Sequence, residues 1–287
     1  MSRIALPPRE EIVADVRRAL EEDVGRGDLT AELLPLEQRI KARVIARDDG
    51  VLCGRAWFDA CFAQLDGGAP TRVDWQVEEG GRVASGQTLC ELEGRARAVI
   101  SGERSALNFL QLLSGVATKT RRYVEAVART RAQIVDTRKT LPGLRLAQKY
   151  AVRVGGGGNH RLALWDAILI KENHIMAAGG IAAAMSAALR IAPAHCRFVQ
   201  IEVENLAEME DALAANAKML LLDNFDLPTL RQAARLNRGR AVLEASGGLT
   251  LADLRAVAET GIDRISVGAL TKDIKAFDLS LRVISGA

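Results

Sequence analysis

Between residues 39 and 94, apolar positions alternate with polar ones, which is the period of a half-buried β-strand. One such run extends from Ile40 to Ala46 and ends at the turn sequence Asp48-Asp49-Gly50. A second extends from Val73 to Val77 and ends at Gly80-Gly81. This part of the chain is therefore predicted to be mostly sheet.

Two other segments place apolar residues at helical spacing, one before the predicted sheet and one after it. The first follows Pro7 and Pro8, a pair that favours a helix start, and the second follows Ser101. Their apolar faces consist of Ile12, Val13, Val16 and Leu20 in the first helix and of Ala106, Phe109, Leu110 and Leu113 in the second. We place a domain boundary near Gly115, so that residues 1–115 form the first domain.

After residue 132 the pattern changes to short β-rich runs, each separated from the next by a stretch long enough for one helix. The runs are QIVDT, AILIK, FVQIEVE, MLLLD, AVLEAS and RISVG. Repeated βα units bury both faces of a parallel sheet, which favours an α/β barrel, closed or partly open, over residues 116–270. An open doubly wound sheet is the alternative. In both architectures the ligand binds at the carboxyl ends of the strands.

The composition is that of an ordinary globular chain, with 48% hydrophobic and 26% charged residues among 287. The formal net charge of +3 is far from the excess expected of a protein that coats nucleic acid or an anionic membrane. Four cysteines without CxxC spacing indicate free thiols in a reducing compartment. The first twenty residues lack the continuous apolar core of a secretory signal. We therefore expect a soluble, cytoplasmic protein without nucleic-acid or membrane partners.

Positive charge is concentrated in residues 138–171, which contain seven lysines and arginines and one acid, a local charge of +6. A solvated basic helix accounts for Arg145, Lys149 and Arg153. It does not account for Lys171, which follows the apolar run AILI, where an unpaired charge is costly. Lys171 therefore needs an anion or a carboxylate nearby.

Small residues follow the last two predicted strands, as Ser246-Gly247-Gly248 and Val267-Gly268-Ala269. Small residues at this position allow the backbone of a barrel to hold a phosphate group. Two tight βα turns without a ligand are the alternative interpretation.

Two carboxylates, Glu202 and Asp223, close successive predicted strands. Such hard oxygen ligands suit a Mg²⁺ ion shared with substrate phosphates, although they could instead balance Lys139 and Lys171 in structural ion pairs. The predicted site thus combines cations, a phosphate cradle and a carboxylate pair, and it has no evident Ser or Cys nucleophile. This combination favours a transferase that uses a sugar phosphate. A Schiff-base lyase that uses Lys171 is the second candidate.

Eight strings occur in order from residue 136 onward: DTRKTLPGLR, QKYAV, GGGGNHR, LIKENH, EVENL, LDNF, EASGG and GALTK. Together they resemble the quinolinate phosphoribosyltransferase family, also called nicotinate-nucleotide pyrophosphorylase (decarboxylating). The resemblance extends from EDVGRGDLT through SGERSALNFLQ to DLSLR and covers nearly the whole chain. It implies an N-terminal α/β sandwich-like domain, an open, TIM-like α/β barrel, and a tail, residues 271–287, that returns to the first domain.

The resemblance also implies an activity: transfer of phosphoribose from phosphoribosyl pyrophosphate to the ring nitrogen of quinolinate, with loss of the 2-carboxylate. The products are nicotinate mononucleotide, pyrophosphate and CO₂, in NAD biosynthesis. A Mg²⁺ cofactor and a homodimer with shared active sites are implied as well. A related branch linked to molybdenum uptake shares this fold, but the full set of Arg and Lys residues argues against it. A non-catalytic dicarboxylate-binding protein would need the cations without the two carboxylates.

Matching motif by motif assigns the site residues. Those implied to hold the two carboxylates of quinolinate are Arg138, His160, Arg161, Lys171 and, from the neighbouring subunit, Arg104. Those implied to serve the pyrophosphate and the metal are Lys139, Glu202 and Asp223, the last two as metal ligands. Those implied to cradle the phosphoribosyl phosphate are Ser246, Gly247, Gly248, Val267, Gly268 and Ala269. Thr137 is a further implied substrate-binding residue, and the implied catalytic residues are Lys139, Lys171, Glu202 and Asp223.

Overall fold

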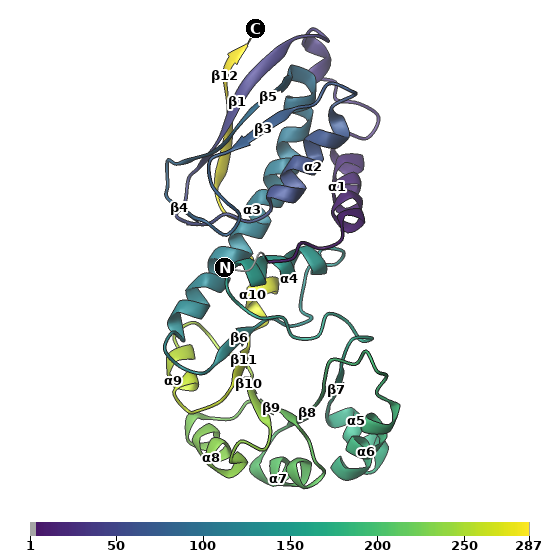
Figure 1. Ribbon diagram of the computed structural model, residues 1–287, viewed down its shortest axis with the longest axis vertical. Coiled ribbons are helices and arrows are strands. Elements are labelled where there is room, and N and C mark those ends of the chain that lie inside the picture. Colours follow the sequence, from purple (N-terminus) through teal and green to yellow (C-terminus); the bar gives the residue numbers. More distant parts are fainter. Residues whose placement is uncertain (1–3, 287) are drawn as a thin grey trace. The chain divides into compact units, whose positions relative to one another are not determined.

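The computed structural model describes residues 4–286, which fall into two compact units (Figure 1). The first unit comprises the chain up to residue 121, residues 141–156 and the segment from residue 273 onward. The second comprises residues 122–140 and 157–272.

The first unit is built on a four-stranded antiparallel sheet in the order β12-β1-β5-β3. Its strands are β1 (Arg39–Ala46), β3 (Arg72–Trp75), β5 (Thr88–Arg95) and β12 (Leu279–Gly286). A separate antiparallel pair joins β2 (Gly50–Val51) to β4 (Arg82–Val83). Alternate residues of β1 are buried, as the period of two predicts. The last strand of the chain thus pairs with the first one.

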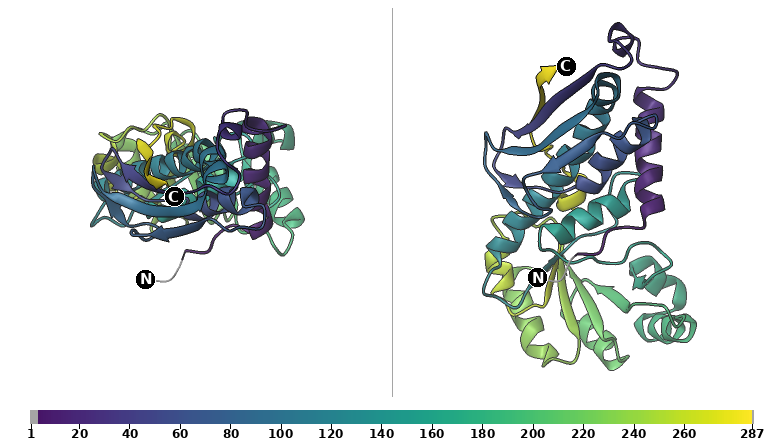
Figure 2. Two further views of the ribbon diagram at one scale, coloured as in Figure 1. Left: turned by 90° about the horizontal axis from the view of Figure 1, so that it is seen from above. Right: turned by 45° about the horizontal axis from the view of Figure 1, so that its top comes forward.

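Three helices lie on one face of this sheet: α1 (Arg9–Asp23), α2 (Arg55–Leu65) and α3 (Ala96–Ala126) (Figures 1 and 2). The unit also contains the short 3₁₀ helix η1 (Ala31–Leu33) and α4 (Arg145–Val154). Phe58 of α2 makes an edge contact with Trp75 of β3, with ring centroids 5.2 Å apart, which fixes α2 on the sheet. Helix α3 begins before Ser101, so the helix is longer than its apolar spacing predicts.

The interpretation of α4 as a solvated basic helix is wrong for Lys149, which is 1% exposed. Six consecutive residues, 147–152, are buried, so the middle of this helix is surrounded by the first unit. Arg145 and Arg153, near its two ends, keep partial exposure. A helix enclosed on most sides buries even a lysine that its polar spacing would assign to solvent.

The second unit contains six parallel strands in the order β6-β11-β10-β9-β8-β7. They are β6 (Gln133–Val135), β7 (Ile168–Ile170), β8 (Val199–Val203), β9 (Met219–Asp223), β10 (Val242–Ser246) and β11 (Arg264–Ser266). The order follows the chain from β7 to β11 without the reversal of a doubly wound sheet, and β6 lies next to β11. This confirms the α/β barrel, open between β6 and β7.

Five helices of the second unit lie outside its strands (Figures 1 and 2). They are α5 (Glu172–Ala178), α6 (Ile181–Ile191), α7 (Leu206–Ala214), α8 (Leu227–Asn237) and α9 (Leu254–Ala258). The short helix α10 (Ala269–Lys272) follows the carboxyl end of β11. Asn205 and Asp226 cap the N-termini of α7 and α8, because their side chains accept the N–H groups of Glu208 and Thr229. Within residues 4–286, no single helix has the length and apolar character to cross a membrane. Helices α5 and α6 reach that length and apolar character only when taken together, and the pair is bent by 95°.

Candidate active site

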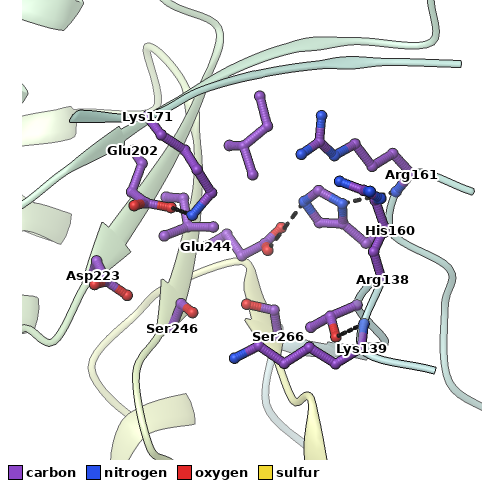
Figure 3. Close-up of a pocket in the computed structure, with 13 residues that line it drawn as sticks. Arg138, Lys139, His160, Arg161, Lys171, Glu202, Asp223, Glu244, Ser246 and Ser266 are labelled. Carbon is purple, nitrogen blue, oxygen red and sulfur yellow. Dashed lines mark hydrogen bonds and ion pairs between the residues drawn. The ribbon is translucent and has the colours of Figure 1, made fainter. Parts of the chain in front are cut away.

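A pocket of about 500 Å³ lies at the carboxyl ends of the parallel strands, within the second unit (Figure 3). Nine residues implied by the family motifs line it: Thr137, Arg138, Lys139, His160, Arg161, Lys171, Glu202, Asp223 and Ser246. Four further residues complete the lining: Leu169, Leu221, Glu244 and Ser266. The fold therefore brings together side chains from loops and strands that are far apart in the sequence.

Arg138 and Arg161 give one side of the pocket its positive charge (Figure 3). Arg161 is 8% exposed, and its guanidinium donates to the carbonyl oxygen of Ala167 at 3.5 Å. Burial lowers the pKa of Arg161, and the charge of Arg138 lowers it further. A bound anion would offset both the burial and the repulsion, so this side of the pocket is suited to a carboxylate.

His160 connects Arg161 to the buried interior. Its backbone N–H donates to Asp136, a fully buried carboxylate that also accepts from Asn159. Its Nδ1 accepts the N–H of Arg161 at 2.8 Å, which places the ring proton on Nε2, where it donates to Gln200 Oε1 at 2.7 Å. Both ring nitrogens are thus engaged within the protein, and the ring fixes the start of the Arg161 segment.

Lys171 lies directly after β7 and caps the N-terminus of α5. Its Nζ forms an ion pair with Glu202 Oε2 at 2.7 Å, which supplies the nearby carboxylate that the sequence requires. The exposed fraction of the side chain is 49% for Lys171 and 14% for Glu202, so the pair faces the pocket from its wall. An amine held in this ion pair is not free to attack a carbonyl, which disfavours the Schiff-base alternative.

Asp223 and Ser246 are opposite each other at the ends of β9 and β10. Asp223 Oδ2 accepts from the side-chain amide of Asn224 at 2.8 Å. Gly247 has a φ of +112°, and a Cβ at this position would overlap Asn224 Oδ1. The turn after β10 therefore requires glycine, which brings the backbone close to the pocket. Gly248, with a φ of +53°, completes the turn.

Lys139 is positioned by contacts within its own loop and with the segment that follows β11. Its backbone N–H donates to Thr137 Oγ1 at 3.0 Å, and its carbonyl accepts from Thr271 Oγ1 at 2.7 Å. A Cβ on Gly268 would lie 3.0 Å from Lys139 Cδ, so the absence of a side chain at 268 leaves room for Lys139. The exposed lysine extends toward the same side of the pocket as Ser246 and Ser266 (Figure 3).

The remaining implied residues do not line the pocket themselves. Gly247, Gly248, Val267 and Gly268 belong to the segments that follow β10 and β11, and Ala269 is the first residue of α10. Arg104 is an exposed residue of α3 in the first unit.

The motifs assigned no role to Glu244 and Ser266, which lie in the strings AVLEAS and RISVG. The sequence does contain a signal that Glu244 and Ser266 face the pocket, because every second residue of a strand faces the same side. Glu244 therefore shares a face with Ser246, and Ser266 shares one with Gly268. A polar residue two positions before an implied site residue predicts a second polar layer under the pocket.

The donor set for a metal consists of Glu202 and Asp223, on the adjacent strands β8 and β9. Within residues 4–286, no three or more His, Cys, Asp or Glu residues cluster as metal ligands. Two carboxylates at a pocket rim fit Mg²⁺, which is usually held by one or two carboxylates with water and substrate phosphates completing its shell.

An open parallel α/β barrel with cations, a carboxylate pair and glycine turns at its strand ends defines an enzyme that acts on anionic substrates, of which one carries phosphate. The domain models described as quinolinate phosphoribosyl transferase, N-terminal domain and C-terminal domain, match residues 28–114 and 116–282. The chain belongs to the quinolinate phosphoribosyltransferase family.

Individual relatives are similar to this chain over nearly its whole length. A Mycobacterium leprae nicotinate-nucleotide pyrophosphorylase (carboxylating) is 42% identical over 275 residues, which cover 93% of this chain and 95% of the relative. A probable enzyme of the same name from Bacillus subtilis is 41% identical over 91% of this chain and 90% of its own length. The solved nicotinate-nucleotide pyrophosphorylase of Francisella tularensis matches with a TM-score of 0.93 and 42% identity, covering 99% of this chain and 100% of that one.

Family membership at this identity gives the chain nicotinate-nucleotide pyrophosphorylase activity in NAD biosynthesis, with quinolinate as a substrate. The function and the fold that the motifs imply are thereby confirmed.

Proposed function

We propose that this pocket binds quinolinate beside phosphoribosyl pyrophosphate and joins the ring nitrogen to the ribose, with release of pyrophosphate and CO₂. The observation that carries the proposal is the division of the pocket, with arginines on one side and Glu202, Asp223 and Ser246 on the other (Figure 3). Incubation of the pure protein with both substrates and Mg²⁺ should yield nicotinate mononucleotide. Absence of this product, with folded protein, would refute the assignment.

Arg138 and Arg161 bind the two carboxylates of quinolinate in this proposal, with Lys171 at the edge of the same site. The lowered pKa of Arg161, caused by burial and by Arg138, supports this role because a bound dianion would compensate both effects. His160 contributes by fixing the backbone of Arg161 through its Nδ1.

Lys139, Glu202 and Asp223 serve the departing pyrophosphate. When bound by Glu202 and Asp223, Mg²⁺ would neutralise charge on the phosphates. Lys139 adds a positive charge near the leaving oxygens, and the two carboxylates face the positive charge that develops on the ribose. No covalent intermediate with the protein is needed, so these residues mainly orient the substrates.

The turns after β10 and β11 hold the 5′-phosphate of the ribose in this proposal. The positive φ angles of Gly247 and Gly248 and the close approach of Gly268 to Lys139 support it, since they keep side chains out of the space at the strand ends. Ser246 adds a hydroxyl donor.

We further propose a homodimer in which Arg104 of one subunit completes the pocket of the other. The exposure of Arg104 on α3 is compatible with this role. Mixing inactive Arg104→Ala protein with inactive Lys139→Ala protein, under conditions of subunit exchange, should restore about a quarter of wild-type activity, because half of the dimers then carry one intact site. A mixture that stays inactive despite proven exchange would place Arg104 in its own chain's site.

We also propose that the enzyme works in the cytoplasm. The free thiols Cys53, Cys61 and Cys90, all buried, support a reducing compartment. Fractionation of the source cells, followed by assay of each fraction, tests this location.

A further inference from the structure

A buried carboxyl group without a normal hydrogen bond lies in the wall of the pocket. Glu244, on β10, has a side chain that is 0% exposed. Within the described residues, neither of its oxygens makes a hydrogen bond of normal geometry with the protein. Its nearest charged or titratable neighbours are His160, with Nε2 3.5 Å from Oε1, and Arg264, with Nε 3.5 Å from Oε2.

The surroundings of Glu244 favour its neutral form. Burial raises the pKa of Glu244, and the carboxylate of Asp136 raises it further. Arg264, Ser266 and Gln200 act in the opposite direction but do not outweigh burial. The proton of His160 Nε2 is directed at Gln200, so that ring does not supply a full positive charge.

The other two carboxylates of the pocket have partners within the protein. Glu202 is paired with the ammonium group of Lys171 at 2.7 Å, and Asp223 accepts a hydrogen bond from Asn224. Glu244 therefore differs from Glu202 and Asp223: it is fully buried without a normal hydrogen bond, whereas each of them has a partner in the protein.

Glu244 also lies where the reaction must occur. Figure 3 shows it between the side of Arg138 and Arg161 and the side of Glu202 and Asp223. If quinolinate occupies the first side and phosphoribosyl pyrophosphate the second, the ring nitrogen and the ribose meet above this acid. The carbon that loses its carboxylate, C2, is bonded to that nitrogen.

We propose that Glu244 is the acid that protonates C2 of the pyridine ring after CO₂ leaves, an inference that rests on the proposed function. The bond between C2 and its carboxylate breaks, CO₂ departs, and the electron pair stays on C2, where the quaternary nitrogen stabilises it. The O–H proton of Glu244 then moves to C2 and leaves Glu244 as a carboxylate. Water returns a proton to Glu244 before the next turnover. A neutral acid beside the carbanion supplies this proton without adding negative charge to an anionic site.

The test compares pyrophosphate and CO₂ released by wild type, Glu244→Gln, Glu244→Asp and Glu210→Gln. Glutamine keeps the shape and polarity of Glu244 but cannot donate the proton, whereas aspartate can. The control removes an exposed glutamate of α7 outside the pocket. In Glu244→Gln we expect the ratio of CO₂ to pyrophosphate to fall at least tenfold. A mononucleotide that keeps both carboxylates should accumulate and be visible by mass spectrometry.

Glu244→Asp should restore the ratio at least in part, and Glu210→Gln should match wild type. A ratio near one in Glu244→Gln would overturn the proposal, and so would an equal loss of both products, which would indicate a structural or purely electrostatic role.

A second measurement uses the wild type alone. Raising the pH removes the proton from Glu244, so the mononucleotide that keeps both carboxylates should form an increasing share of the product. A constant share up to high pH would contradict the proposal. Failure of the wild type to make any mononucleotide would instead refute the proposed function.

Discussion

The choice between quinolinate and nicotinate tests the charge of the pocket most directly. Nicotinate lacks one of the two carboxylates, so part of the positive charge of Arg138 and Arg161 would not be balanced by a substrate anion. Arg161 is the critical case, because it is 8% exposed and Arg138 already repels it. Leaving a buried charge unpaired in a complex costs about 2 to 5 kcal/mol. At about 1.4 kcal/mol per factor of ten, quinolinate should be favoured roughly 30-fold to several thousandfold in kcat/KM.

The assay measures mononucleotide formation from each acid at saturating phosphoribosyl pyrophosphate and Mg²⁺, and compares the two values of kcat/KM. Arg161→Ala removes the buried charge, so it should lower the efficiency with quinolinate far more than the efficiency with nicotinate, and thereby reduce the preference. Arg231→Ala, an exposed arginine of α8, is the matched control and should keep it.

Comparable efficiency with the two acids in the wild type would refute this reasoning, since it would mean that the second carboxylate meets no buried cation. An unchanged preference in Arg161→Ala would refute the assignment of Arg161, and would move the second carboxylate to Arg138 or Lys171.

Three further predictions concern single contacts. Glu202→Gln breaks the ion pair with Lys171 and should lower kcat at least tenfold while changing the calorimetric Kd for quinolinate by less; the reverse pattern would assign Glu202 to quinolinate. Asp166→Ala removes a buried carboxylate that holds the loop before β7, and urea unfolding should show a loss of about 1.5 to 3 kcal/mol. Despite burial, hydrogen bonds lower the pKa of Asp166 below 3.8, so this stabilisation is complete above that pH and disappears as the pH falls through the folded-state value; a difference that persists in acid would contradict the account. Gly115→Ala places a Cβ against the carbonyl oxygen of Lys275 and should lower the free energy of unfolding by about 1 to 3 kcal/mol. An unchanged free energy of unfolding would show that the segments of Gly115 and Lys275 can move apart without loss of stability.

The barrel could be predicted because its signals are local. Each parallel strand is a short apolar run, and β9 shows the pattern clearly, with four buried residues before Asp223. The residue that closes each strand then lies at the common edge, so the sequence alone predicts that Lys171, Glu202 and Ser246 lie close together. The roles of these residues came from family motifs, and they stay predictions, as does the domain boundary near Gly115.

Burial of polar residues could not be predicted, because it depends on what packs around an element. Lys149 has the spacing of a solvated residue, yet the first unit encloses the middle of α4. Gln200 and Glu244 share the pocket-facing side of their strands with Glu202 and Ser246, but the period of two does not tell which side chains of different strands contact one another. Only the structure shows that they meet His160 in one buried group under the pocket.

That buried group has unmet hydrogen-bonding capacity, which is unusual in a protein interior. Both oxygens of Glu244, together with Gln200 Nε2 and Arg264 Nε, are buried without hydrogen-bond partners among the described residues. Apolar side chains of similar volume would remove this desolvation cost, so stability does not explain these residues. The cost is explained if the acid must stay close to the reacting ring and remain uncharged there. A well-paired Glu244 would be a carboxylate, which would repel two anionic substrates and could donate no proton. Incomplete pairing beneath the pocket is therefore the condition under which Glu244 can act as an acid.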